Sequence, residues 1–178
     1  MPEEQKYIYF ASGENRQRLS QLPQLEKLTE KGFDVLLMTD EVDSFVPQTL
    51  GKYADKDFRS VTQEDLGLST DVEMKEAAGK AEKSKATLEF VKTTLGDAVK
   101  EVRLSDNLGT HPVCMVPEEG MTFEMEKYFQ RLNPEMGMKA GRILELNPNH
   151  SLFGLLQVAG APDEEKAKKL AKILYAQA

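Results

Sequence analysis

Residues 7–61 alternate between segments that favour strands and segments that favour helices. The segments 7–10, 33–38 and 58–61 are rich in aromatic and branched apolar residues, which favour strands. Helical patterns at 15–31 and 40–50 separate them. This alternation predicts a small α/β unit with parallel strands and right-handed crossovers. The nearly continuous apolar run of the second strand predicts a sheet covered on both faces, and therefore a three-layer α/β/α arrangement.

A polar stretch at residues 63–69 ends this alternation and predicts a boundary between two domains, over residues 1–68 and 69–178. Thr70 and Glu73 then have the spacing of a capping box. Small and apolar residues follow at alternating steps of three and four, and predict one connecting helix of about 25 residues, ~38 Å long. These residues are Met74, Ala77, Ala81, Ser84, Leu88, Val91 and Leu95.

The second domain has strands and helices joined by loops of mixed length, which predicts an α+β fold. The predicted strands are 99–104, 113–116 and 142–146, and a short helix follows at 151–158. A last helix is predicted to start at Pro162, where proline fits the first helical position and acidic residues follow. Its apolar face consists of Ala167, Leu170, Ala171 and Leu174.

Residues 115–138 hold five of the eight methionines of the chain. Four apolar residues of this segment recur with helical spacing, namely Met121, Met125, Tyr128 and Leu132. Thioether side chains are flexible and polarizable, so a surface rich in them adapts to varied apolar partners. The pattern alone favours an ordinary helix that covers a sheet. Phe123 and Phe129 favour a partner-binding surface, because both do not fit on the same narrow stripe.

Composition and charge argue against several classes of function. The net charge of −7 argues against nucleic acid, because affinity for a duplex comes largely from lysine and arginine. No run approaches the ~18 apolar residues that span a bilayer, and the first residues do not have the pattern of a signal peptide. Cys114 is the only cysteine, so an internal disulfide is not possible. These features predict a cytoplasmic protein without a membrane partner.

The sequence carries only a weak signal for nucleotide or phosphoryl chemistry. Gly13 follows the first strand, but a dinucleotide-binding turn needs three glycines, and Glu14 would repel a phosphate. Asp40, Glu41 and Asp43 could hold a divalent cation as in phospho-acceptor domains. Acidic residues in a first turn also cap helices without any metal, which is the favoured interpretation. A small α/β nucleotide-binding or phospho-acceptor enzyme therefore remains only the alternative.

Residues for a metal site or a hydrolytic triad are also few. His111 and Cys114 have ligand-like spacing, but further cysteine or histidine ligands are not near in the sequence, and zinc usually takes four. A triad would have to use His111 or His150, each beside turn residues, and the chain has no nucleophile elbow. We therefore expect no catalytic residue, no metal and no cofactor in this chain.

Several motifs, in the right order, resemble the bacterial heat-shock protein 90 family of chaperones. One group is similar to the small distal α/β part of that family's middle domain: residues 7–10, 25–28, 31–40 and 57–62. A second group is similar to the family's C-terminal dimerisation domain: residues 100–105, 111–114 and 143–150. The resemblance covers nearly the whole chain.

The resemblance implies a client-binding, dimer-forming fragment of an ATP-dependent chaperone that binds unfolded or partly folded proteins. In the family an amphipathic helix of the C-terminal domain contacts clients, and four residues match it: Met121, Met125, Tyr128 and Phe129. A second client patch in the family pairs an aromatic residue with an amide three places later. Phe45 and Gln48 fit those two places.

The resemblance also implies what this chain does not do alone. ATP and magnesium belong to the family's N-terminal domain, and the catalytic arginine to the larger part of the middle domain, so no ATP hydrolysis is expected here. The family forms homodimers through a bundle of four helices. Ala167, Leu170, Ala171 and Leu174 would join that bundle. The second helix of the bundle does not occur in this sequence, so a weakened homodimer is expected.

Overall fold

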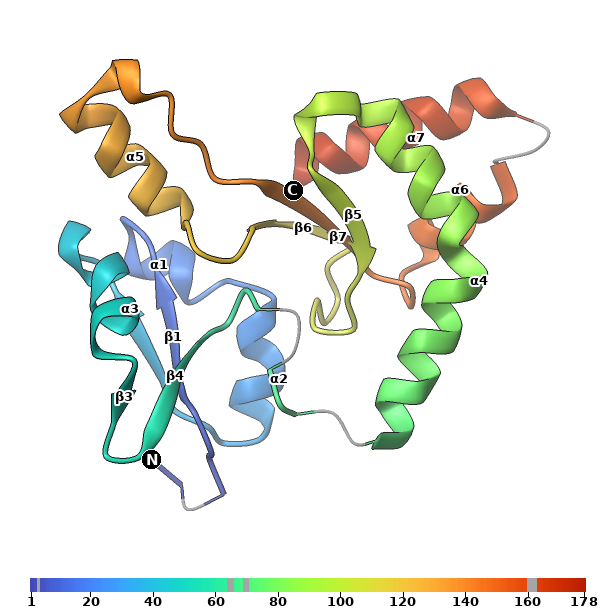
Figure 1. Ribbon diagram of the computed structural model, residues 1–178. Helices are drawn as coiled ribbons and strands as arrows, with labels where there is room; N and C mark the ends of the chain where they lie inside the picture. Colours follow the sequence, from blue (N-terminus) through green and yellow to red (C-terminus); the bar gives the residue numbers. More distant parts are fainter. Residues whose placement is uncertain (3, 64–65, 69–70, 160–162) are drawn as a thin grey trace. The chain divides into compact units, whose positions relative to one another are not determined.

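The computed structural model describes residues 1–2, 4–63, 66–68, 71–159 and 163–178 (Figure 1). The chain forms two compact units: unit 1 comprises Met1–Leu66 and Pro117–Ala140, and unit 2 comprises Gly67–Val116 and Gly141–Ala178. The boundary between Leu66 and Gly67 lies close to the one predicted between residues 68 and 69. The structure differs from the prediction by grouping Pro117–Ala140 with unit 1.

Unit 1 is built on a four-stranded sheet in the order β2-β1-β4-β3. β1 is parallel to both of its neighbours, so that Phe10 lies beside Leu36 of β2 and Ser60 of β4. β3 pairs antiparallel with β4 through a tight turn at Ala54 and Asp55. The strands are β1 (Ile8–Ser12), β2 (Val35–Met38), β3 (Lys52–Tyr53) and β4 (Lys56–Ser60). The three predicted strands and their parallel pairing are confirmed, and β3 was not predicted.

The prediction that the second strand is buried on both faces is wrong. β2 lies at the edge of the sheet, and Leu36 on it is 47% exposed. The central strand is β1, whose first four residues are all buried. On β1, the Tyr9 hydroxyl donates a hydrogen bond to the Leu66 carbonyl at 2.6 Å. β2 has the apolar run of a buried strand, yet it has a neighbouring strand on one side only. An apolar run alone therefore does not show whether a strand lies in the interior or at the edge of a sheet. The three-layer arrangement stays a prediction.

The helices of unit 1 are shorter than predicted. The segment 15–31 forms two helices, α1 (Arg16–Leu19) and α2 (Gln24–Glu30), with Pro23 before the second. Proline has no N–H to donate and its ring clashes with the preceding turn, so one continuous helix is not possible here. The segment 40–50 forms a 3-10 helix, η1 (Glu41–Phe45), and then α3 (Val46–Leu50).

Unit 2 has a three-stranded sheet in the order β5-β7-β6, with β5 and β7 parallel. Its strands are β5 (Glu101–Leu104), β6 (Val113–Pro117) and β7 (Arg142–Leu146). Its helices are α4 (Asp71–Leu95), the short η2 (Gly96–Ala98), α6 (Ser151–Ala159) and α7 (Glu164–Gln177). The core includes Val91, Val102, Leu144, Leu146 and Leu156. The mixed α and β class is confirmed, as are the three predicted strands.

α4 is the long helix that the spacing predicts, and it has the expected 25 residues. Ser84 and Val91 are buried, and Leu88 packs against the core of unit 2, but Ala81 is exposed. The row of small and apolar residues on α4 therefore packs against unit 2 in the C-terminal part of the helix. The predicted caps at Thr70 and Pro162 lie outside the described residues. Among the helices that the structure describes, none combines the length and the apolar character needed to cross a membrane.

The apolar face of α7 is covered by unit 2 itself. Ala167, Ala171 and Leu174 are at most 2% exposed, and α7 packs against α4 and α6. Leu170 packs against the same core. The expectation that these four residues need cover from a second chain is therefore wrong, because helices of the same unit supply it. Among the side chains that the structure describes on α6 and α7, the large apolar ones left exposed are Leu155, at 55%, and Ile173, at 54%.

An ion pair joins β5 to β7 inside unit 2. Arg103 and Glu145 are register partners, and the Arg103 Nε and Nη2 atoms donate to Glu145 Oε1 at 3.1 and 2.7 Å. Glu145 is 2% exposed. Removing one partner of such a pair leaves an uncompensated charge in a poorly solvated site, which is strongly destabilising.

We predict that Arg103→Met lowers the free energy of unfolding by about 3–5 kcal/mol, because Glu145 keeps a buried charge without its cation. Adding Glu145→Leu should recover most of this loss, since the buried charge is then removed. Urea unfolding of the two variants and the wild type measures both effects. A double variant as unstable as Arg103→Met would contradict the proposed cause.

Candidate functional site

The methionine-rich segment forms helix α5 (Phe123–Leu132), which packs against η1 in unit 1 (Figure 1). The Thr122 hydroxyl caps it by accepting a hydrogen bond from the Met125 N–H at 3.1 Å. Asn133 ends the helix, and a 3-10 turn, η3 (Pro134–Met136), follows. The predicted helix is confirmed, except that Met121 lies just before it.

Three aromatic rings join η1 to α5. The Phe45 ring lies 5.4 Å from that of Tyr128 and 5.9 Å from that of Phe129, between ring centroids. Tyr128 and Phe129 are themselves 5.8 Å apart. All three pairs meet edge to face, an arrangement that contributes about 0.5–1.5 kcal/mol per pair beyond surface burial. The structure therefore brings the two predicted client patches together.

Gln48 makes a second connection between the two patches. Its Nε2 atom donates to the Gly120 carbonyl at 3.1 Å and lies 3.7 Å from the Met125 sulfur. The Gln48 side chain is otherwise exposed, and Met121 is half-buried. Thus Phe45 and Gln48, from one predicted patch, both contact residues 120–129. Their role in binding stays a prediction.

Met125 is a core residue of unit 1. It is 4% exposed, whereas Leu132, on the same predicted stripe, is 65% exposed. Met125 therefore does not lie on an exposed face of the helix. It lies beside Gln48 of α3, whereas Leu132, the last residue of α5, is exposed. The ordinary interpretation of a covered helix face holds for Met125, but the element that α5 packs against is η1, where that interpretation predicted a sheet.

Glu126 is a structural residue that the sequence does not reveal. It is 6% exposed, and its Oε2 atom accepts a hydrogen bond from the Ala140 N–H at 3.0 Å. Its Oε1 atom accepts another from Gln130 Nε2 at 3.0 Å. Glu126 thereby ties α5 to the segment that follows it. A glutamate outside the apolar stripe predicts a solvated position, and only the structure shows that it is buried.

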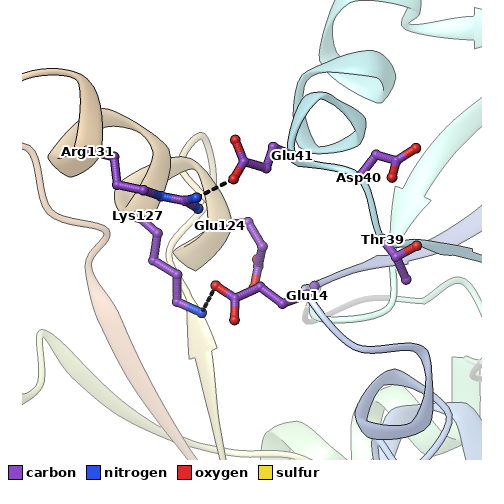
Figure 2. A pocket seen from close by; sticks show the side chains of 8 residues that line it. Glu14, Thr39, Asp40, Glu41, Glu124, Lys127 and Arg131 are labelled. Carbon is purple, nitrogen blue, oxygen red and sulfur yellow. Dashed lines mark hydrogen bonds and ion pairs between the residues drawn. The ribbon is translucent and has the colours of Figure 1, made fainter.

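Two ion pairs lie along the edge of α5 (Figure 2). Lys127 Nζ lies 3.1 Å from the Glu14 carboxylate, and Arg131 pairs with Glu41. All four side chains are largely exposed, so each pair contributes little to stability. Because both cations are on α5 and both anions on residues 1–66, the pairs orient the helix on this surface.

A small cavity of about 20 Å³ lies between these ion pairs, with room for about one water molecule. Glu124 lines it together with Gly13 and Glu14. Burial raises the pKa of Glu124, so its contribution to stability is present at low pH and lost as the pH rises through the raised pKa. The hydrogen bond and charge of Lys127 lower the pKa of Glu14, whose contribution is lost as the pH falls. The two carboxyl groups therefore change stability with pH in opposite directions.

Other residues with a candidate chemical role have structural roles here. The Asp40 N–H donates to Asp43 Oδ2 at 3.0 Å and completes a capping box, so the predicted role of these acidic residues as a helix cap is confirmed. His150 Nδ1 accepts a hydrogen bond from the Leu152 N–H at 3.2 Å, near the start of α6. A side chain at Gly13 would lie 2.9 Å from Leu19, which explains the glycine without a phosphate. Within the described ranges, no group of three or more His, Cys, Asp or Glu residues is placed to hold a metal.

We predict that Met125→Glu lowers the free energy of unfolding by about 2–5 kcal/mol, because it removes a buried side chain and buries a charge. Leu132→Glu on the same helix should change it by less than ~0.5 kcal/mol, because Leu132 is exposed. Thermal and urea unfolding of the two variants measure the difference. Equal effects would mean that α5 does not pack against η1 in solution.

Comparison with known proteins matches the whole chain to one family. The family model described as "Hsp90 protein" matches residues 1–178. The chain is 41% identical over 178 residues to "Chaperone protein HtpG" of Bacillus subtilis and to that of Clostridium acetobutylicum. Each match covers 100% of this chain and 28% of the relative, so the chain spans little more than a quarter of the length of these curated relatives. These names give no support to the alternative of a small nucleotide-binding enzyme.

Proposed function

The chain belongs to the Hsp90 protein family of heat-shock chaperones, and we propose that it is the client-binding and dimer-forming part of an HtpG chaperone. In this proposal residues 1–68 belong to the distal part of the middle domain, and residues 69–178 to the C-terminal domain. The order of the motifs, which resembles the C-terminal part of the family, supports this placement. Clients would be unfolded or partly folded proteins.

We propose that five residues form one client surface, Phe45, Gln48, Met121, Tyr128 and Phe129, while the buried Met125 holds α5 in place beside Gln48. The observation that carries this proposal is the contact between Phe45 and the two aromatic residues of α5, which lie more than 80 positions later in the chain. Two patches that each resemble a client site in the family are thereby neighbours in one unit. Flexible methionines and partly exposed rings suit apolar segments of varied sequence.

Exposed apolar side chains near this surface support the same proposal. Val42 on η1 is 64% exposed, Leu50 at the end of α3 is 56% exposed and Leu132 at the end of α5 is 65% exposed. Each helix or turn that carries a residue of the client surface thus also presents a large apolar side chain to solvent. Exposed apolar side chains on the same elements as the aromatic cluster suit a surface that binds apolar segments.

We predict that Phe45→Ala and Met121→Glu each weaken binding of a permanently unfolded polypeptide by on the order of tenfold, which is about 1.4 kcal/mol. Both side chains are half-buried, so truncation or charge at either position removes apolar contact without emptying the core. Fluorescence anisotropy with a labelled, reduced and carboxymethylated protein measures the dissociation constants.

Matched controls for this experiment come from the other exposed apolar positions of unit 1. Tyr53, 69% exposed on β3, and Leu36, 47% exposed on β2, lie outside the proposed surface. Tyr53→Ala and Leu36→Glu should leave binding within about twofold of the wild type, on the scale of neutral surface changes. If the controls weaken binding as much as the two site variants, binding is not localised to the proposed surface.

We propose that this chain binds no nucleotide and needs no cofactor, because ATP and magnesium belong to the N-terminal domain of the family. The turn at Gly13 supports this, since the Leu19 side chain fills the space beside it. We predict no change in melting temperature with ATP and magnesium. Occupying a real site a hundredfold above its dissociation constant would add about 2.7 kcal/mol to stability. A shift that follows the nucleotide concentration would refute the prediction.

We propose a homodimer that uses the exposed side chains of α6 and α7. Ala167, Ala171 and Leu174 are already buried inside unit 2. They would hold α7 in position and would not contact the partner chain themselves. Leu155 and Ile173 are large apolar side chains that face solvent on these helices. A two-fold axis would place the same residues of both chains at the interface.

We predict that this self-association is weaker than ~1 µM, because the two exposed large apolar side chains described on α6 and α7 are few for a stable interface of about 1,600 Å². Sedimentation velocity over a dilution series measures it, and Leu155→Asp with Ile173→Asp should abolish it. Tyr53→Asp, an exposed position of unit 1, serves as the control. A dimer that persists at nanomolar concentration, or in the double variant, would mean that another surface joins the chains.

A further inference from the structure

The two halves of the proposed client surface cover one another. Phe45 contacts both aromatic residues of α5, and Gln48 donates to the Gly120 carbonyl just before that helix. Met125, which carries much of the apolar character of α5, is 4% exposed. In this arrangement an incoming polypeptide finds most of the surface already in contact with the chain itself.

The surface that receives α5 is acidic, and the facing edge of α5 is basic. Glu14 and Glu41 pair with Lys127 and Arg131, which lie one helical turn apart on the same edge (Figure 2). We call Glu14, Glu41, Phe45 and Gln48 the receiving surface. An aromatic centre flanked by carboxylates suits an amphipathic helix with aromatic residues and lysine or arginine beside them.

The connections of α5 allow it to move as one element. Gly120 precedes the helix with φ +98°, and Gly137 follows it with φ +61°. A side chain at either glycine would meet nothing within 4 Å, and because the hydrogen bond from Ala140 to Glu126 spans Gly137, α5 and the segment through Ala140 would move together. Glycine populates such backbone conformations and others equally easily, and a few residues of this kind suffice as hinges.

We infer that α5 is an internal ligand of its own chain: it occupies the receiving surface as a basic, aromatic amphipathic helix, and its release uncovers both halves of the client surface. The inference rests on the proposed function, because it names what the client surface accepts. Clients that present the chemistry of α5, aromatic or methionine side chains with a neighbouring Lys or Arg, then compete with the helix for the receiving surface.

The first experiment weakens the contact between α5 and the receiving surface by reversing charges on the helix. Lys127→Glu with Arg131→Glu places like charges opposite Glu14 and Glu41, and each exposed pair changes an equilibrium by about two- to fivefold. We expect the double reversal to shift α5 toward release by on the order of tenfold. Methyl NMR of Met125 reports this directly, because its methyl group moves from a buried to a solvated environment.

A charge swap separates release from unfolding. Adding Glu14→Lys and Glu41→Lys to the reversal variant restores attraction with the signs exchanged, so the buried signal of Met125 should return. Lys31→Glu with Lys139→Glu is the matched control, since both lysines are exposed in unit 1 and the net charge changes equally. A Met125 signal unchanged by reversal, or not restored by the swap, overturns the inference.

The second experiment supplies the helix from outside. A synthetic peptide with residues 119–133 of the natural sequence should bind the reversal variant, whose receiving surface is intact and vacated, about tenfold more tightly than it binds the wild type. Chemical shifts of Phe45 and Gln48 locate the site. Equal binding to both proteins would show that α5 does not occupy the receiving surface, and the inference would fail.

Binding of unfolded polypeptide to the reversal variant and to the wild type distinguishes this inference from the proposed function. Tighter binding by the reversal variant than by the wild type supports both. Equal binding despite a released Met125 overturns the inference, because the covered surface would then not be what clients use. If no variant binds unfolded polypeptide while the peptide 119–133 still binds the vacated surface, the proposed function fails and the internal ligand is supported.

Discussion

The seating of α5 on η1 and α3 is the contact on which the candidate site depends. It is made by an edge-to-face aromatic cluster centred on Phe45, by the hydrogen bond from Gln48 and by two ion pairs at the rim. Without this contact the two predicted client patches would belong to separate segments of the chain. With it, residues 41–48 and 120–131 form one surface that is apolar at its centre and charged at its edge.

Unit 2 has a different kind of constraint, because its polar groups are buried inside the sheet region. Glu145 on β7 pairs with Arg103, and Asn147 donates two hydrogen bonds, to the carbonyls of Gly109 and His111, at 3.0 and 2.9 Å. Buried groups of this kind hold one geometry, since a shift leaves them unsatisfied. Unit 2 is thereby a fixed frame of strands and helices, whereas the ion pairs that α5 makes in unit 1 lie at an exposed rim.

The sequence predicts the elements better than their contacts. Period and composition identify β1, α4, α5 and the strands of unit 2, because these signals are local. They give Met125 and Leu132 the same place on a stripe, yet one is buried and the other exposed, because burial depends on contacts such as that of Met125 with Gln48, 77 residues away in the chain. The buried state of Glu126 has no local signal. Pro23 is a different case, since proline inside a helical pattern predicts the break that the structure shows.

The strength of the α5 contact suits a helix that can leave without unfolding the unit. Each aromatic pair contributes about 0.5–1.5 kcal/mol and the exposed ion pairs add little, so these contacts amount to a few kcal/mol before the entropy of ordering the helix is subtracted. A whole domain is stable by about 5–15 kcal/mol. Burial of Met125 adds to the contact, but a flexible thioether also repacks readily on another surface. The four-stranded sheet, with β1 at its centre, makes its strand pairing without α5, so local release of the helix costs less than unfolding.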